Sequence, residues 1–277
     1  MLQDKLKEHL LAKNKQKELE HTRSGYLSAS RLWKSTLENC LSLLDVKGLE
    51  IDAYALGVFA RGNQVEDWIV EQFNEMGLLE RYQTEVAYIT PDGYKVVGIE
   101  DCKFKGEDMP TEIKSIKNSQ FKYLDLEGAK MAHKLQACVY ALAGGYEKFR
   151  VLYVSAEDFR IKEFILFTKD YKDKVVELVR DVYDALNKKR LPEFEPLDDF
   201  MASKKYTEYT AYPNWFGAYK EKEVKVERTG TTGKKYTRTY KQEVLDKTHD
   251  SDILMEALKR QHPEAYSKLM EVRKWGK

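Results

Sequence analysis

Apolar residues recur at helical spacing through the first quarter of the chain. The segment 2–21 carries Leu2, Leu6, Leu10 and Leu11 at helical spacing among lysines and glutamates, which predicts an exposed amphipathic helix or arm. A second helix is predicted over 31–44, with Ser28 or Ser30 as its N-cap, and a third over 52–76. The N-terminal region is therefore predicted to be helical.

The pattern changes to strict alternation at about residue 82, which is typical of half-buried strands. A Pro-Asp-Gly turn between the first two alternating runs predicts a β-hairpin. Strand, strand, strand, helix, strand, strand and helix are predicted in turn at 82–89, 94–104, 111–117, 128–142, 149–155, 160–167 and 169–189. With the helix before them, these elements predict an α/β fold in the order αβββαβ, a central mixed sheet flanked by helices.

Beyond Pro192 the regular pattern is lost. Aromatic residues crowd together there, a Lys-rich hairpin-like run follows over 223–241, and one or two helices interrupted at Pro263 end the chain. The sequence therefore predicts three parts, a helical region, an α/β core and a basic, aromatic appendage, at 1–50, 51–191 and 192–277.

Composition indicates the cellular location and the partners of this protein more clearly than its activity. The 277 residues include 47 basic and 46 acidic side chains, a formal net charge of +1, so any surface for a polyanion must be local. Cys40, Cys102 and Cys138 lie far apart, which argues against a disulfide framework and a structural zinc site. The charged N-terminus and the lack of a long apolar stretch lead us to expect a cytoplasmic protein without a membrane partner.

Candidate chemistry is concentrated in two of the predicted strands. Asp101 lies in the strand 94–104, and Glu112 and Lys114 share one face of the next strand. If the two strands are neighbours, two carboxylates and an ammonium converge. Carboxylates that close repel one another, and a hard divalent cation such as Mg²⁺ is the usual remedy. An isolated Glu-x-Lys, however, is usually only a solvated strand face.

The motifs around Glu112 and Lys114 favour a metal site over a solvated strand face. G-x-x-D at 98–101, E-x-K at 112–114 and Q-x-x-x-Y at 136–140 follow one another in this order. Together they resemble the RecB-like and CRISPR-adaptation branch of the PD-(D/E)XK nuclease superfamily, over roughly residues 57–167. The resemblance implies a restriction-endonuclease-like core that hydrolyses DNA phosphodiester bonds.

Carried over position by position, the resemblance implies a metal-dependent catalytic centre. Asp101, Glu112 and Lys114 would be catalytic, and Asp101, Glu112 and the Ile113 carbonyl would bind Mg²⁺ or Mn²⁺. The metal would polarise a phosphoryl oxygen and activate a water, while Lys114 would position that water or stabilise developing charge.

Two neighbouring helices complete the predicted centre. Gln136 and Tyr140 would contact the DNA, and His133 shares their helix face by its spacing. On the preceding helix the family often has Gly-x-x-x-His, whereas this chain has Glu66 at the place of the histidine. We predict that Glu66 is a further metal ligand; the alternative is a surface residue beside Asp67.

Some members of this branch bind an iron–sulfur cluster through four cysteines, one before the core and three after it. Here only Cys40 precedes the core and none follows Cys138, so no cluster is expected. Cys102 and Cys138 are predicted to be small buried residues.

The basic and aromatic residues of the appendage suit single-stranded DNA, because cations can meet phosphates while aromatic faces stack on unpaired bases. The predicted DNA contacts here are Trp215, Tyr219, Lys234, Lys235 and Arg238. A plain hydrophobic subdomain with a solvated hairpin is the alternative, and the family resemblance does not extend to this region.

These patterns predict a Mg²⁺-dependent deoxyribonuclease. We favour an exonuclease acting on DNA ends or single strands in phage or bacterial recombination or repair, with a recombination or single-strand-binding protein as a further partner. Two alternatives stay open: a structure-specific or site-specific endonuclease, and a non-catalytic DNA-binding scaffold on a nuclease fold.

Overall fold

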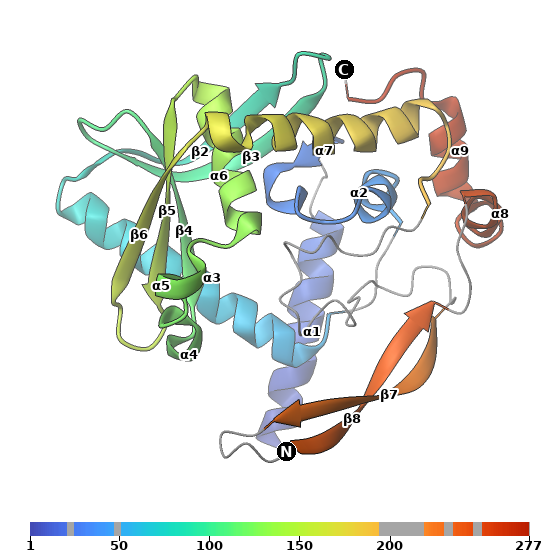
Figure 1. The fold of residues 1–277 in the computed structure, drawn as a ribbon, viewed down its shortest axis with the longest axis horizontal. Coiled ribbons are helices and arrows are strands. Elements are labelled where there is room, and N and C mark those ends of the chain that lie inside the picture. The colour runs from blue at the N-terminus through green and yellow to red at the C-terminus, as the bar shows by residue number, and fades with distance from the viewer. Residues whose placement is uncertain (21–24, 47–50, 194–218, 230–234, 246–250, 277) are drawn as a thin grey trace. The chain divides into compact units, whose positions relative to one another are not determined.

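The computed structural model describes six stretches of the chain, which are drawn as ribbons in Figure 1: residues 1–20, 25–46, 51–193, 219–229, 235–245 and 251–276. The chain divides into two compact units. One consists of Met1–Trp33, Glu50–Tyr183 and Lys274–Lys277, and the other of Lys34–Leu49 and Asp184–Arg273.

A six-stranded mixed sheet forms the centre of the first unit (Figure 1). Its strands are β1 (Leu27–Ser28), β2 (Leu79–Ile89), β3 (Lys95–Phe104), β4 (Pro110–Ile116), β5 (Lys148–Ser155) and β6 (Ile161–Phe167). The order is β1-β3-β4-β5-β6, with β2 also paired to β3. The β1–β3 and β4–β5 pairs are parallel and the others are antiparallel.

Strand β3 has three partners, which creates a fork in the sheet. β2 pairs along the length of β3, so β1 and β4 must share its other edge. β1 pairs there with Val96 and Val97, whereas β4 pairs with Cys102 and Lys103. The segment 98–101 lies between these two pairings, where β4 has already diverged from β3. The segment that carries the predicted Asp101 therefore faces a gap in the hydrogen-bond ladder.

Helices cover both faces of this sheet. Those of the first unit are α1 (Leu2–Glu20), η1 (Ala29–Arg31), α3 (Ala53–Glu75), α4 (Asn118–Phe121), α5 (Leu124–Glu127) and α6 (Met131–Gly144); α7 (Lys169–Asn187) runs on into the second unit. Val65 and Ile69 of α3 pack in one apolar cluster with Cys102, Ile113 and Leu152.

Helix α6 covers the opposite face and contacts β2, β3, β4 and β5. Side chains alternate across a strand, so Glu112 and Lys114 lie on the face opposite to that of Ile113, which packs with α3. Ile113 therefore packs against α3, whereas Glu112 and Lys114 are on the face of β4 that α6 covers.

The second unit contains α2 (Thr36–Leu43), α8 (Ser251–Gln261), α9 (Pro263–Glu271) and an antiparallel pair of strands, β7 (Tyr219–Thr229) and β8 (Lys235–Leu245). Pro263 occupies the first turn of α9, where its missing N–H costs nothing. The predicted Lys-rich hairpin is confirmed as this pair of strands.

The predicted fold class, a mixed central sheet flanked by helices, is confirmed. The predicted helix over 31–44 is wrong at its start: α2 is capped by Ser35, whose Oγ accepts from Glu38 N at 3.1 Å. Ser28 instead pairs with β3 and leads into a 3-10 turn. The helix predicted from residue 128 begins at Met131, because Gly128, at φ +69°, ends the short helix α5. In the described ranges, no helix is long and apolar enough to cross a membrane.

Candidate active site

The predicted catalytic residues meet at the fork between β3 and β4. The Asp101 Oδ2 accepts a hydrogen bond of 2.7 Å from the Ile113 N–H, so a side chain replaces the ladder bond that the diverging strands no longer make. Glu112 is fully buried, and its Oε1 lies 2.5 Å from the Lys114 Nζ. The neighbouring strands β3 and β4 therefore bring two carboxylates and one ammonium together.

Helix α3 adds a third carboxylate. The Glu66 Oε1 accepts from the Ser115 N–H at 3.0 Å, across 49 positions of sequence, and its Oε2 lies 3.8 Å from the Lys114 Nζ. Glu66 is thus attached to the backbone of β4, one residue beyond Lys114.

The Lys114 ammonium is the cation at the centre of this group. Besides the contacts with Glu112 and Glu66, its Nζ donates to the Ile113 carbonyl at 3.0 Å. Burial disfavours the charged ammonium, but Glu112, Asp101 and Glu66 outweigh it and raise the pKa of Lys114.

The three carboxylates are held in surroundings that disfavour their ionised forms. Burial, followed by the charge of Asp101, raises the pKa of Glu112 to about 8 against the opposing effect of Lys114. Burial likewise raises the pKa of Asp101 and of Glu66. A single ammonium thus only partly compensates three acids packed around it.

The donors at the fork fit a hard divalent cation in their chemistry. Both Glu112 carboxylate oxygens are buried without a hydrogen bond of acceptable geometry, although Oε1 forms the close ion pair with Lys114. Glu66, Asp101, Glu112 and the Ile113 carbonyl are all oxygen donors, as Mg²⁺ and Mn²⁺ prefer. In the arrangement shown, the described residues contain no set of three His, Cys, Asp or Glu side chains close enough to hold a metal.

The helix α6 residues lie beside the carboxylates and are mostly covered. Tyr140 is 1% exposed, and its hydroxyl accepts from the Gln136 Nε2 at 2.7 Å. Burial, with the charges of Glu112 and Asp101, raises the pKa of Tyr140. The Tyr140 ring therefore offers no exposed surface for a base and instead lies next to the carboxylates of Glu112 and Asp101.

Gly98, the first residue of the G-x-x-D motif, makes room for Tyr140. A Cβ at Gly98 would lie 2.7 Å from the Tyr140 Cε1 and 3.1 Å from the Ala29 Cβ. The close approach of β3 and α6 explains why glycine suits this position, since its φ needs no glycine.

His133 has a different partner from the one its spacing suggested. Its Nδ1 lies 2.8 Å from the hydroxyl of Tyr153, which also accepts from the Lys130 N–H at 2.8 Å. Burial, helped by the charges of Lys114 and Lys130, lowers the pKa of His133 to about 3, so the imidazole is neutral. Sequence reasoning missed Tyr153. The parallel pairing of β4 with β5 places Tyr153 of β5 opposite Lys114 of β4, and this register cannot be seen in the sequence.

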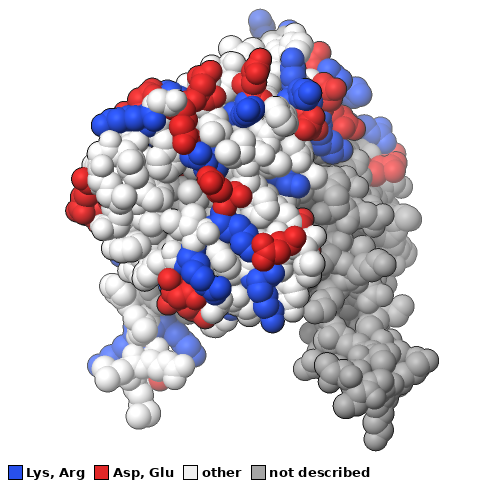
Figure 2. Space-filling view, turned by 60° about the vertical axis from the view of Figure 1, so that its left-hand side comes forward, with Lys and Arg blue, Asp and Glu red and all other residues white. Residues whose placement is uncertain are grey.

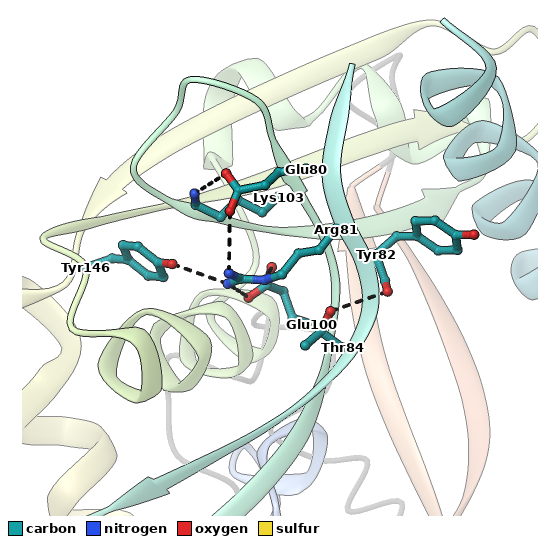
Figure 3. Close-up of polar contacts among 7 residues, drawn as sticks. All are labelled: Glu80, Arg81, Tyr82, Thr84, Glu100, Lys103 and Tyr146. Atoms are coloured by element: carbon teal, nitrogen blue, oxygen red, sulfur yellow. Dashed lines mark hydrogen bonds and ion pairs between the residues drawn. The ribbon is translucent and has the colours of Figure 1, made fainter. Parts of the chain in front are cut away.

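A second cluster of charged residues, which the sequence did not reveal, surrounds Glu100 of β3 (Figure 3). Glu100 is fully buried and accepts two hydrogen bonds from Arg81, at 3.1 and 2.8 Å. Arg81 also donates to the Tyr146 hydroxyl at 3.3 Å, and Lys103 pairs with Glu80 at 2.6 Å. The available signal was a second acid, Glu100, directly before Asp101 in β3.

The remaining predicted contacts belong to the C-terminal part of the chain. Trp215 and Lys234 lie outside the described residues. Tyr219 lies in β7, and Lys235 and Arg238 lie in β8. Their contact with DNA stays a prediction.

The distribution of charged residues and the burial of the cysteines agree with what the sequence predicted. Basic and acidic side chains are interspersed on the face of the molecule in Figure 2, as expected from a net charge of +1. Cys102 and Cys138 are buried as predicted, and Cys40 is buried as well.

Comparison with known proteins gives only distant structural likenesses. No protein-family model and no curated protein matches the sequence. The chain is similar to the structure called SSO0001 (TM-score 0.45, 17% identity, 66% of this chain and 85% of that one). It is also similar to an alkaline exonuclease, LHK-Exo, from Laribacter hongkongensis (TM-score 0.45, 17% identity, 60% and 88%), and to LHK-Exo in complex with dAMP (TM-score 0.40, 15% identity, 57% and 88%). The function proposed below therefore depends on the residues of the fork itself.

Proposed function

We propose that this chain is a metal-dependent DNA nuclease of the PD-(D/E)XK type. The observation that carries the proposal is the convergence of Glu66, Asp101 and Glu112 around the Lys114 ammonium at the β3–β4 fork. Burying three carboxylates from three separate elements together costs free energy, and titratable groups held in such surroundings are typical of functional sites. The finer activity that we propose is that of an exonuclease acting on DNA ends or single strands.

Each residue has a role that its position supports. Glu66, Asp101, Glu112 and the Ile113 carbonyl would hold Mg²⁺ or Mn²⁺, which when bound supplies a Lewis acid and a more acidic water. The side chain of Lys114, already within hydrogen-bonding distance of Glu112 and the Ile113 carbonyl, orients the attacking water or stabilises charge on the phosphate.

Helix α6 supports this chemistry from behind. We propose that Tyr140, fixed by the hydrogen bond from Gln136 and by its packing against Gly98, positions the Glu112 carboxylate. Gln136, which is only partly buried, is the residue of the pair that can also reach a substrate. His133 supports the same helix through Tyr153.

The proposal can be tested with purified protein and end-labelled single-stranded, duplex and circular DNA, with and without Mg²⁺. We expect Mg²⁺-dependent release of labelled nucleotides from linear DNA and no cleavage of circles. Cleavage of circles would assign an endonuclease, structure-specific or site-specific, to the same centre. Absence of cleavage with Mg²⁺ or Mn²⁺ on every substrate would favour a DNA-binding scaffold.

Variants of the carboxylates connect any activity to the fork. Asp101→Asn and Glu112→Gln should each lower cleavage by at least about a hundredfold and weaken Mn²⁺ binding in calorimetry, because each removes an anionic ligand of nearly unchanged shape. Glu85→Gln, an exposed carboxylate on β2, is the matched control. Unchanged Mn²⁺ binding and cleavage in both fork variants would exclude these residues from the site.

A further inference from the structure

The hydroxyl of Tyr153 lies between the N-terminus of α6 and the imidazole of His133. Tyr153 is fully buried in β5, directly opposite Lys114 of β4 in the parallel register. Its oxygen accepts a hydrogen bond of 2.8 Å from the backbone N–H of Lys130, the N-cap residue of α6. The same oxygen lies 2.8 Å from the His133 Nδ1. One buried hydroxyl therefore connects the start of a helix with a titratable side chain of its first turn.

The hydrogen bonds of this hydroxyl determine which nitrogen of His133 carries a hydrogen. A tyrosine has a single O–H to donate, and its oxygen already accepts from the Lys130 N–H. With hydrogen on Nδ1, the oxygen would accept twice and the buried O–H would lack an acceptor among the described residues, which costs free energy. Donation from Tyr153 to Nδ1 satisfies both groups. The neutral imidazole therefore carries its hydrogen on Nε2.

The Nε2 of His133 has no hydrogen-bond partner in the part of the chain that the structure describes. The imidazole is only partly buried, so this nitrogen can meet a ligand. It is also close enough to the fork for the charge of Lys114 to help lower the pKa of His133. A donor without a protein partner, beside the ammonium of the proposed catalytic centre, suits an anionic oxygen of the substrate.

We infer that Tyr153 holds His133 in the Nε2–H tautomer, so that Nε2 donates a hydrogen bond to a phosphate oxygen of DNA at the fork. His133 is then the residue that touches the substrate, and Tyr153 is a positioning residue that acts through it. The donor is present in both protonation states, because a protonated imidazole also carries hydrogen on Nε2. The identity of the anion as a DNA phosphate rests on the proposed function.

The alternative is that the contact between Tyr153 and His133 only attaches α6 to the sheet. Two substitutions distinguish these roles, because an asparagine amide reaches about as far as Nδ1 and a glutamine amide about as far as Nε2. His133→Asn keeps a partner for Tyr153 and loses the donor at Nε2, whereas His133→Gln does the reverse. His133→Gln should therefore cleave end-labelled oligonucleotide at least about tenfold faster than His133→Asn. Equal rates, or the opposite order, would overturn the inference.

The tautomer itself can be read by NMR of the full-length protein labelled with ¹⁵N-histidine. The chain has five histidines, and the spectrum of His133→Gln identifies the signals of His133 by their loss. In the parent protein the protonated nitrogen should be Nε2, which is recognised by its coupling to both carbon-bound protons of the ring. A purely structural contact makes no demand on the nitrogen that faces the substrate.

Removal of the Tyr153 hydroxyl tests the positioning role. In Tyr153→Phe both nitrogen resonances of His133 should move toward the average of the two tautomers, because Nδ1 has lost its donor. Cleavage should fall by at least about fivefold. Tyr82→Phe, at an exposed tyrosine of β2, is the matched control and should change neither property. An unchanged His133 spectrum in Tyr153→Phe would show that this hydroxyl does not set the tautomer and would overturn the inference.

A titration with oligothymidylate in EDTA keeps this inference apart from the proposed function, since it requires no cleavage. Bound DNA should shift the Nε2 resonance of His133 more than the Nδ1 resonance. Such a shift in a protein that never cleaves DNA would refute the nuclease and leave this inference standing. Hydrogen on Nδ1 in the parent protein, or an Nε2 resonance that excess oligothymidylate leaves unmoved, would overturn this inference even in an active nuclease.

Discussion

The β3–β4 fork and the neighbouring Glu100 cluster both bury carboxylates, but the charges of these carboxylates are compensated in different ways. At the fork, Glu66, Asp101 and Glu112 share one ammonium, that of Lys114. In the Glu100 cluster, a single buried carboxylate accepts two hydrogen bonds from the Arg81 guanidinium. A carboxylate with a bidentate partner suits a structural role, whereas carboxylates that share one cation suit the binding of a further cation.

The strongest way to sharpen this comparison is to remove the ammonium at the fork. Lys114→Ala should lower cleavage by about a hundred- to a thousandfold, because it removes a cation from the reacting phosphate. Affinity for oligothymidylate in EDTA should stay within about twofold of that of the parent protein. Lys117→Ala, an exposed lysine just beyond β4, is the control. Joint loss of binding and turnover in Lys114→Ala would show that this ammonium holds the DNA rather than acting on the reacting phosphate.

A second experiment tests how far the fork depends on its buried support. Arg81→Met should lower the free energy of unfolding in urea by about 2–3 kcal/mol, because the fully buried Glu100 loses its bidentate partner. Lys174→Met, which removes an exposed ion pair with Glu177, should cost less than about 0.5 kcal/mol. Similar small losses in both variants would mean that the Glu100 cluster contributes little to the sheet around Asp101.

Alanine substitutions at two glycines should change the stability of the protein by smaller amounts and in opposite directions. Gly98→Ala should destabilise the protein by about 1–2 kcal/mol and reduce cleavage, because its Cβ would overlap the Tyr140 ring. Gly62→Ala in α3, where nothing lies within 4 Å of the new Cβ, should stabilise the protein by up to about 1 kcal/mol. Thermal unfolding of the two variants gives both signs. Stabilisation in both would contradict the close approach of β3 and α6.

The last prediction concerns pH. The folded-state pKa of His133 is lowered to about 3, below its ordinary value of 6.5, so the folded state resists protonation that the unfolded chain accepts. Its contribution to stability is complete above pH 6.5 and falls by up to about 1.4 kcal/mol for each pH unit below that. His133→Gln should flatten the decline of unfolding free energy between pH 6.5 and 4.5, compared with the parent. Parallel pH profiles would contradict a buried, neutral His133.

The periodicity of apolar positions predicted most of the fold. Period-2 and period-3.6 patterns are local properties, so the five strands from β2 to β6, together with α3, α6 and α7, follow from the sequence. β1 could not be predicted, because Leu27 and Ser28 are too short a segment to carry a pattern and become a strand only by pairing with β3. The cap at Ser35 was missed because Ser28 and Ser30 offer the same residue type for an N-cap.

For the candidate site, the sequence by itself determined which residue types could do chemistry: Asp101, Glu112 and Lys114 stand out by spacing on two strands. Only the tertiary structure decided that Glu66 attaches to the Ser115 backbone and that Tyr140 is buried behind the carboxylates. Hydrogen bonds between distant elements and the burial of a ring depend on how α3 and α6 pack on the sheet, which no local pattern encodes.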